Sequence, residues 1–212
     1  MNANANRHSL ADATHGTPHE PLSIALGVAT TPAWVETVLA EFDTFLIDHA
    51  ACERKAAAVA TSMICHYPDR AQLVADMADL AAEEMSHFRQ VIKLIHARGI
   101  QLTPDTKDPY VNALRKHVRH GKQEYLLDRL LIAGLVEARG TERFALIGEH
   151  CEESTLRQFY HQLAVSEARH QRLFVDLALR YVPDQIVAER LRDLQSIEAE
   201  IVTSLPLRAA LH

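Results

Sequence analysis

The 212-residue chain contains the motif Glu-x-x-His twice, as Glu84/His87 and as Glu167/His170. Residues three apart in an α-helix lie one turn apart on the same face, so each motif would present a carboxylate beside an imidazole. Carboxylate oxygens with imidazole nitrogens suit iron or manganese, whereas structural zinc sites favour cysteine and histidine. The two motifs therefore predict a site for a transition metal.

A further glutamate precedes each motif at a nearly constant distance. Glu53 lies 31 residues before Glu84, and Glu137 lies 30 residues before Glu167. A turn falls about midway in each interval, so two antiparallel helices would place both glutamates about 20 Å from the turn, at about 1.5 Å rise per residue. The second half of the chain repeats the first in this respect. We therefore expect four glutamates and two histidines at one height of a helical bundle.

These residues occupy helix faces that are otherwise apolar, such as the face with Leu73, Met77 and Leu80 before Glu84. One glutamate on such a face can reach solvent or pair with an arginine, and this alternative stays open for any single position. Four carboxylates at one level of a dry core would each cost several kcal/mol unless cations neutralise them. Two divalent metal ions would balance the four charges. Six protein ligands on two ions would leave positions free for dioxygen.

Helices must position these residues, and the sequence predicts helices nearly throughout. Thr31 and Pro32 mark the start of a long helix that runs to about His66, Asp69 is expected to cap the next, and Gly99 to end it. The other expected helices are a short one at 109–119, two long ones at 122–150 and 153–181, and a last one at 184–203. This layout predicts an all-α, ferritin-like four-helix bundle of two helical hairpins with an additional C-terminal helix. We expect a disordered tail at 1–20 and a single domain at 21–212.

Composition narrows the class of protein. Hydrophobic residues make up 48% and charged residues 24%, with only 7 glycines and 8 prolines, which argues against a disordered chain or an all-β fold. The three cysteines show no paired spacing, so we expect no disulfides. Cys52, turned about 100° from Glu53 around a helix, is expected to be inert. The sequence has no secretory signal and no transmembrane segment, so we expect a cytoplasmic protein without a membrane partner.

Five short segments carry a resemblance to a known family: Asp48–Ala57, Glu83–Phe88, His96–Gly99, Asp108–Tyr110 and Ser166–His170. They resemble the MiaE family of tRNA hydroxylases, and the resemblance covers about residues 21–203. It implies oxygen-dependent hydroxylation of the isopentenyl group of 2-methylthio-isopentenyl-adenosine, next to the tRNA anticodon. It also implies a carboxylate-bridged, non-haem di-iron centre with these ligands: Glu53, Glu84, His87, Glu137, Glu167 and His170.

The same resemblance implies two iron ions as cofactor and dioxygen as co-substrate. The chain contains no G-x-G-x-x-G motif and no P-loop, so the electrons are expected from an external donor, either an electron-transfer protein or a reductase. A monomer and a small homo-oligomer both stay open.

A tRNA partner requires a basic surface, although the formal net charge of the chain is -6. Residues 88–122 hold eight lysines and arginines against two aspartates. The expected tRNA-binding residues are Arg115, Lys116, Arg119 and Lys122. The alternative is a solvated connection whose charges form salt bridges.

Two further polar residues lie one helical turn from a predicted ligand. Thr141 follows Glu137 and would either relay a proton to bound oxygen or bond to its own helix. His49 precedes Glu53 and would either contact it or belong to the core. Three aromatic residues would either flank the prenylated adenine or pack in the core: Phe159, Tyr160 and Phe174.

Two other functions compete with tRNA hydroxylation. One is a ferritin- or rubrerythrin-like iron or peroxide oxidoreductase that needs no RNA. The other is a non-enzymatic helical module that binds a partner through its basic face and uses the metal only for stability.

Overall fold

A computed structural model describes residues 22–212, so the tail expected at 1–20 lies outside the described residues. The described chain forms seven helices and no strand, which confirms the all-α class. The helices are α1 (Pro32–Ala40), α2 (Phe42–His66), α3 (Ala71–Ala97), α4 (Pro109–Arg115), α5 (Lys122–His150), α6 (Ser154–Tyr181) and α7 (Asp184–Ser204). No helix between residues 22 and 212 is long and apolar enough to cross a membrane.

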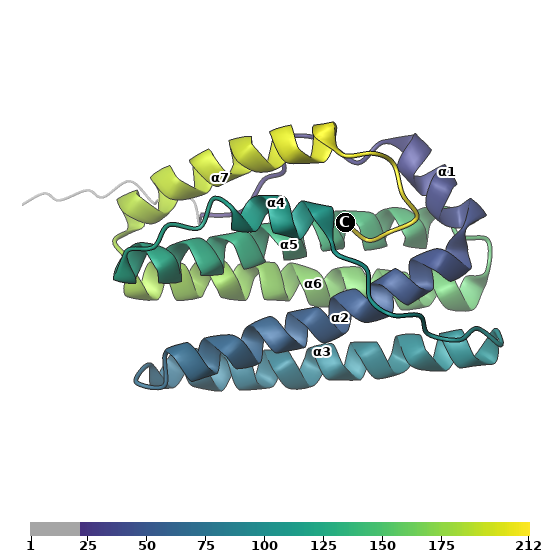
Figure 1. Cartoon of the computed structure of the whole chain (residues 1–212), viewed down its shortest axis with the longest axis horizontal. Coiled ribbons are helices and arrows are strands. Elements are labelled where there is room, and N and C mark those ends of the chain that lie inside the picture. Colours follow the sequence, from purple (N-terminus) through teal and green to yellow (C-terminus); the bar gives the residue numbers. More distant parts are fainter. Residues whose placement is uncertain (1–21) are drawn as a thin grey trace, which may run out of the picture.

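The four long helices α2, α3, α5 and α6 form the bundle. Helices α2 and α3 pack against each other as one hairpin, α5 and α6 as the other, and α3 contacts α6. Figure 1 shows α7 lying along the outside of the second hairpin, where it packs on α4 and α5. The chain between α3 and α5, which includes α4, crosses from one hairpin to the other. This arrangement is the two-hairpin bundle with an additional C-terminal helix.

The single long helix expected at 32–66 is wrong, because the chain bends at Glu41 (φ -120°, ψ 44°) and forms two helices. The bend follows from burial on α1. Trp34 and Val38 pack in a cluster with Phe144 of α5, and the Trp34 ring meets Phe45 edge-on at 6.3 Å. Helix α1 thus packs on both α2 and α5.

The expected cap at Asp69 is also wrong. Arg70 precedes α3 and its side chain makes no capping bond; in the first turn, the Leu73 N–H instead donates to the Tyr181 hydroxyl at 3.2 Å. The turn is closed by the main chain instead, since the Arg70 N–H donates to the Tyr67 carbonyl at 3.1 Å. The expected end at Gly99 is confirmed: its φ of 71° is the left-handed value that glycine adopts readily, and the next N–H, of Ile100, bonds back to Ile95.

The short helix expected at 109–119 ends earlier, at Arg115. Beyond it, His117 and Val118 bond to carbonyls three residues back, which is a tighter turn than an α-helix. The Arg119 N–H then donates to Asp128 of α5 at 2.9 Å, so the chain has already left the helix. The bounds of α5 match the expected 122–150, and those of α6 and α7 differ from expectation by at most one residue at either end.

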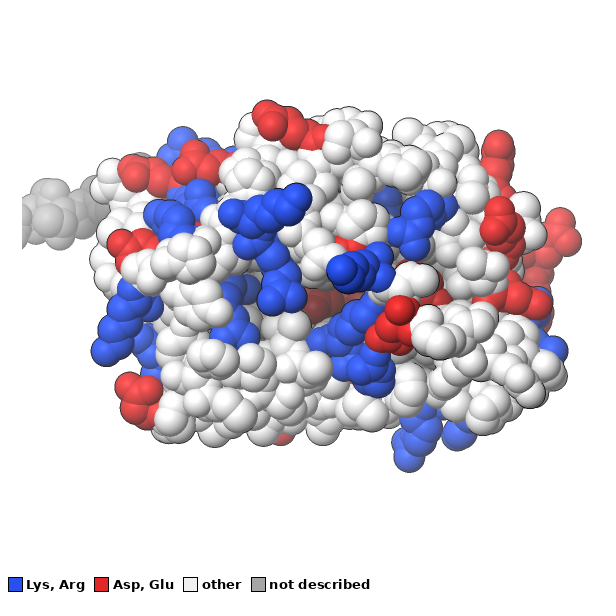
Figure 2. All heavy atoms as spheres, in the orientation of Figure 1, with Lys and Arg blue, Asp and Glu red and all other residues white. Residues whose placement is uncertain are grey.

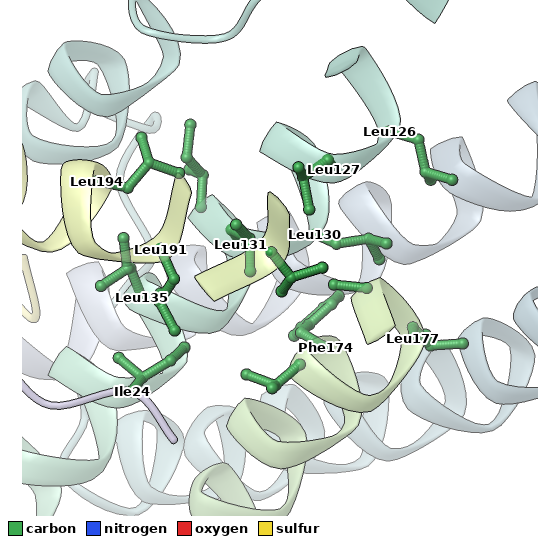
Figure 3. Packing of buried hydrophobic residues seen from close by; sticks show 14 of the residues in the cluster. Ile24, Leu126, Leu127, Leu130, Leu131, Leu135, Phe174, Leu177, Leu191 and Leu194 are labelled. Carbon is green, nitrogen blue, oxygen red and sulfur yellow. The ribbon is translucent and has the colours of Figure 1, made fainter. Parts of the chain in front are cut away.

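Leucines of α5 fill the space between the second hairpin and α7. Figure 3 shows Leu127, Leu131 and Leu135 of α5 among Phe174 of α6 and Leu191 of α7. Each fully buried leucine contributes about 1.5–3 kcal/mol through removal of its surface from water. This apolar cluster therefore holds α5, α6 and α7 together beside the polar residues of α5 and α6.

Candidate metal centre

Four helices bring the six expected side chains together in the bundle interior: Glu53 from α2, Glu84 and His87 from α3, Glu137 from α5, and Glu167 and His170 from α6. They form two groups, and in each group the ligand atoms lie within 4.8 Å of one another. One group consists of Glu53, Glu84, His87 and Glu167; the other consists of Glu84, Glu137, Glu167 and His170. Glu84 and Glu167 belong to both groups, as carboxylates that bridge two metal ions would.

Both histidines direct Nδ1 toward the carboxylates. His87 Nδ1 lies 3.5 Å from Glu53 Oε2 and 3.5 Å from Glu167 Oε1. His170 Nδ1 lies 2.9 Å from Glu84 Oε1 and 3.0 Å from Glu167 Oε2. The centroids of the two imidazole rings are 6.0 Å apart. The cluster thus presents one nitrogen to each group of oxygens.

A metal fits this cluster because its polar atoms are buried without enough hydrogen-bond partners. Glu53, Glu84 and Glu167 are at most 3% exposed. His87 Nδ1 and Glu167 Oε1 make no hydrogen bond, although both atoms are buried. An unsatisfied buried polar atom costs about 1–3 kcal/mol, and a bound cation would satisfy both atoms. The oxygen and nitrogen donor set is the one that iron and manganese accept.

The protonation of the cluster shows the same need for positive charge. Burial, together with the neighbouring carboxylates Glu167 and Glu84, raises the pKa of Glu137 well above its usual value. Burial opposes protonation of His87 and His170, but the carboxylates beside them outweigh it and raise the pKa of each histidine to about 9. Without a metal the cluster therefore holds protons that a divalent cation would displace.

His49 contacts the cluster directly, which the sequence left undecided. Its Nε2 lies 2.6 Å from Glu53 Oε1, and its Nδ1 lies 3.3 Å from the Tyr160 hydroxyl. Burial raises the pKa of Glu53, but the hydrogen bond with His49 and the nearby imidazole of His87 outweigh burial and hold that pKa well below its usual value. His49 therefore keeps this carboxylate ionised and oriented.

Glu83 also approaches the cluster, and the sequence reasoning missed it. Its Oε1 accepts from the Ser166 hydroxyl at 2.5 Å and from Arg169 at 2.8 Å, while its Oε2 lies 3.3 Å from His170 Nε2. The available signal was its position directly before Glu84 and one turn before His87. Glu83 thus links α3 to α6 behind the imidazole of His170.

The sequence also singled out Thr141 and three aromatic residues, and the structure gives them different surroundings. The Thr141 hydroxyl donates to the Glu137 carbonyl at 2.8 Å, which is the local helical bond considered as the alternative to a relay. Tyr160 is fully buried and packs against Phe144 and Phe45 in the core, with Phe159 partly buried beside them. Phe174 differs, because it contributes to the wall of a pocket.

This pocket, of about 930 Å³, connects the surface to the cluster and is lined by Glu53, Glu84, Glu137 and Glu167. Figure 2 shows acidic side chains at the bottom of a hollow and several lysine and arginine side chains around it. The basic residues that line the pocket are Lys55, Lys107, Arg115 and Arg129, together with His66, His120 and His212. A small apolar group with an attached anion would match this distribution.

The four basic residues expected to bind tRNA do not behave alike. Arg115 lines the pocket, and Lys116 and Lys122 are exposed. Arg119 instead donates two side-chain hydrogen bonds to the buried carboxylate of Asp128, at 2.8 and 2.9 Å. Arg190 of α7 binds the same carboxylate at 2.8 Å. Arg119 therefore holds the connection before α5 in place. For this residue the structure agrees with the alternative to tRNA binding, in which charges of residues 88–122 form salt bridges.

Comparisons with known proteins agree with this geometry. The family model described as tRNA-(MS[2]IO[6]A)-hydroxylase (MiaE) matches residues 17–212. A protein of Pseudomonas putida named tRNA 2-(methylsulfanyl)-N(6)-isopentenyladenosine(37) hydroxylase is 39% identical over 84% of this chain and 87% of its own length. A Salmonella typhimurium protein of the same name is 35% identical over 63% of this chain and 48% of its own length.

A solved structure resembles the whole bundle. It is titled "Protein 43 with aldehyde deformylating oxygenase activity from Synechococcus", and it is 39% identical in sequence with a TM-score of 0.84, covering 88% of this chain and 94% of that one. The similarity confirms the ferritin-like fold, in which clusters of carboxylates and histidines bind iron. From the family match and the Pseudomonas putida relative, we conclude that the chain belongs to the MiaE family of tRNA hydroxylases.

Proposed function

We propose that this protein hydroxylates the isopentenyl group of 2-methylthio-isopentenyl-adenosine next to the tRNA anticodon, at a non-haem di-iron centre. One observation carries the proposal: a pocket with a basic rim and apolar walls ends on a cluster of buried carboxylates, in which Glu167 Oε1 makes no hydrogen bond. The family match and the name of the Pseudomonas putida relative support the same substrate.

Two iron ions would be held by Glu53, Glu84, His87, Glu137, Glu167 and His170, with Glu84 and Glu167 shared between them. The four carboxylates would balance the charge of two divalent ions, so the pair binds without leaving net charge in the core. When bound, the ions supply the dioxygen chemistry that inserts one oxygen atom into a C–H bond. The other oxygen atom leaves as water, which requires two electrons and two protons.

The side chains of the pocket would position the substrate. Met63, Val136 and Phe174 offer an apolar surface for the isopentenyl group beside the carboxylates. Arg115 and Lys107 at the rim would meet the phosphates that flank the modified nucleotide. The walls would also keep water from the reacting carbon, while His49 and Glu83 hold Glu53 and His170 in orientation.

The proposal also includes an electron donor, a cellular location, an oligomeric state and roles for three further residues. The electrons would come from an external reductase or electron-transfer protein. A tRNA substrate is consistent with a cytoplasmic protein, acting as a monomer or a small homo-oligomer. The relay role of Thr141 stays a prediction, as does tRNA contact by Lys116 and Lys122.

The test is mass spectrometry of nucleosides from tRNA that carries the prenylated adenosine, after incubation with iron-loaded protein, reductant and dioxygen. We expect that nucleoside to gain one oxygen atom. Oxygen consumption without this gain would favour a ferritin- or rubrerythrin-like oxidoreductase, and metal binding without oxygen consumption would favour a binding module. A long-chain aldehyde serves as the contrasting substrate, because the Synechococcus relative has aldehyde deformylating activity according to its title. We expect no turnover of the aldehyde.

A further inference from the structure

A second group of metal-ligating side chains lies outside the six-residue cluster. It consists of Cys52 on α2, Asp108 just before α4, and His212 in the segment after α7, with ligand atoms within 4.8 Å of one another. Cys52 Sγ is 3.9 Å from His212 Nδ1, and His212 Nδ1 is 3.4 Å from Asp108 Oδ2. Three distant parts of the chain thus converge on one point with three different donor types.

These separations are close to those of a bound metal ion. A tetrahedral ion with bonds of about 2.3 Å to sulfur and about 2.0–2.2 Å to nitrogen and oxygen places its ligand atoms about 3.4–3.6 Å apart. The separation of His212 Nδ1 and Asp108 Oδ2 already has this value, and that of Cys52 Sγ and His212 Nδ1 exceeds it by a few tenths of an ångström. Thiolate, imidazole and carboxylate together are typical ligands of zinc and other divalent ions of intermediate softness.

Contacts that leave the ligand atoms free hold Asp108 and His212 in place, whereas the Cys52 thiol donates to Asp48 Oδ2 at 3.7 Å. Asp108 Oδ1 accepts from the Val111 N–H at 3.0 Å, which leaves Oδ2 directed at His212. The His212 ring stacks on Tyr110 at 5.3 Å with an angle of 8° between the planes. Figure 1 shows the C-terminal end of the chain beside α4.

The imidazole of His212 is buried at the point where the three donors meet. Its side chain is only 5% exposed. Its Nδ1 faces both the thiol and the carboxylate. The main chain beside it is fixed, since the Leu211 N–H donates to Asp48 at 2.8 Å and the Leu211 carbonyl accepts from Arg143. A buried imidazole held in this way, with a thiol and a carboxylate at Nδ1, is an arrangement that points to a cation.

We propose that Cys52, Asp108 and His212 form a mononuclear site for a divalent cation of the zinc class, separate from the dinuclear cluster. On binding, the Cys52 thiol gives its proton to solvent and a metal–sulfur bond forms, with no change of oxidation state. The three residues also line the pocket that leads to the carboxylate cluster. The ion would fasten the C-terminal segment and the start of α4 to α2, and so fix one wall of the pocket.

Cobalt(II) titration of the metal-free full-length protein tests the site, because only a thiolate ligand gives the near-ultraviolet sulfur-to-cobalt charge-transfer band. The dinuclear cluster contains no cysteine and cannot produce this band. We expect the band at one equivalent per chain in the wild type. We expect it to be lost in Cys52→Ser and retained in Cys151→Ser, which alters a buried cysteine outside the group.

Asp108→Asn provides a second variant that preserves folding, since asparagine can still accept from Val111 at the start of α4. It should weaken cobalt binding at this site by about tenfold or more, judging by the effects of changes near metal ligands. The proposal is overturned if the wild type shows no thiolate band, if Cys52→Ser retains it, or if Asp108→Asn binds cobalt as the wild type does. Because the readout is cobalt absorption, failure here is distinguishable from failure of tRNA hydroxylation.

Discussion

His49 and Glu53 lie one turn apart on α2, and their side chains meet in the bundle interior, with His49 Nε2 2.6 Å from Glu53 Oε1. The other ring nitrogen of His49 faces the buried hydroxyl of Tyr160 at 3.3 Å. A carboxylate that is expected to bind metal is therefore fixed by a histidine that is itself fixed by the core. This relationship ties the orientation of Glu53 to the packing of α6.

Replacing His49 with alanine should weaken iron binding by about 10–100-fold, because loss of such an orienting partner typically has that effect. The pKa of Glu53 would also rise toward its usual value, so protons would compete better with the metal. Chelator competition measures the change in affinity. His49→Gln, which can still donate to Glu53, should lose less. Equal affinity in His49→Ala and the wild type would contradict the orienting role.

Stability of the metal-free protein should fall as pH rises from about 6.5 to 9. The folded pKa of His87 and of His170 is raised to about 9, so their stabilising contribution is complete below the unfolded value of 6.5 and is lost as pH passes 9. Burial raises the pKa of Glu84, Glu137 and Glu167, which acts in the same direction. The loss is on the order of 3 kcal/mol per histidine.

Thermal unfolding with and without two equivalents of iron(II), under anaerobic conditions, measures this effect. The metal-loaded protein should show a flatter dependence on pH, since the metal replaces the protons. A metal-free melting temperature that rises between pH 6.5 and 9 would contradict the assignment of protons to the cluster.

Reversing charge at the pocket rim should weaken tRNA binding without changing the metal site. Arg115→Glu with Lys116→Glu should raise the KM for tRNA at unchanged iron content. The salt dependence of binding should also fall, by about one counterion for each phosphate that the variant no longer neutralises. Lys93→Glu on α3, exposed and outside the pocket lining, is the matched control. An unchanged KM in the double variant would show that this surface does not bind tRNA.

Arg119→Glu should behave differently from the other basic residues. Its partner Asp128 is fully buried and is also bound by Arg190, so a glutamate at position 119 would place like charges together. The expected result is a lower melting temperature, measurable by circular dichroism. An effect of Arg119→Glu on tRNA affinity alone, at wild-type stability, would contradict the structural role.

Breaking the buried pair between Arg139 of α5 and Glu198 of α7 should destabilise the fold by about 3–5 kcal/mol, because the remaining charge stays buried without its partner. Arg139 Nη2 lies 2.7 Å from Glu198 Oε1, and both side chains are fully buried. The Tyr110 hydroxyl donates to the same carboxylate at 2.9 Å, so α4 is held as well. Denaturant unfolding of Arg139→Met measures the loss, and a change below about 1 kcal/mol would contradict it.

The long helices and the common level of the four glutamates along the bundle could be predicted from the sequence, because both depend on the local spacing of residues. Glu53 and Glu84 are 31 residues apart across a short turn, and a helical hairpin leaves few ways to arrange them. The bend at Glu41 depends on where Trp34 packs, and α1 meets α5 more than a hundred residues later in the chain. No local pattern contains that information.

Side-chain contacts between distant segments could not be predicted from the sequence either. The Trp34 indole donates to the Ala210 carbonyl, and His212 reaches Asp108, so the C-terminal segment packs against the start of the fold. Glu83 could have been noticed beside Glu84, but its partners Ser166 and Arg169 come from the other hairpin. Pairings across the two hairpins require the tertiary structure.

The central claim is that the carboxylate cluster uses dioxygen to hydroxylate a prenylated tRNA nucleoside. Single-turnover incubation of the iron-loaded protein with this tRNA, a reductant and isotopically heavy dioxygen tests it most directly, with Glu167→Gln as the variant that removes a shared ligand. We predict that mass spectrometry finds one heavy oxygen atom in the isopentenyl group with the wild type and none with Glu167→Gln. A product that contains only oxygen from water, or equal incorporation by the variant, would contradict the account.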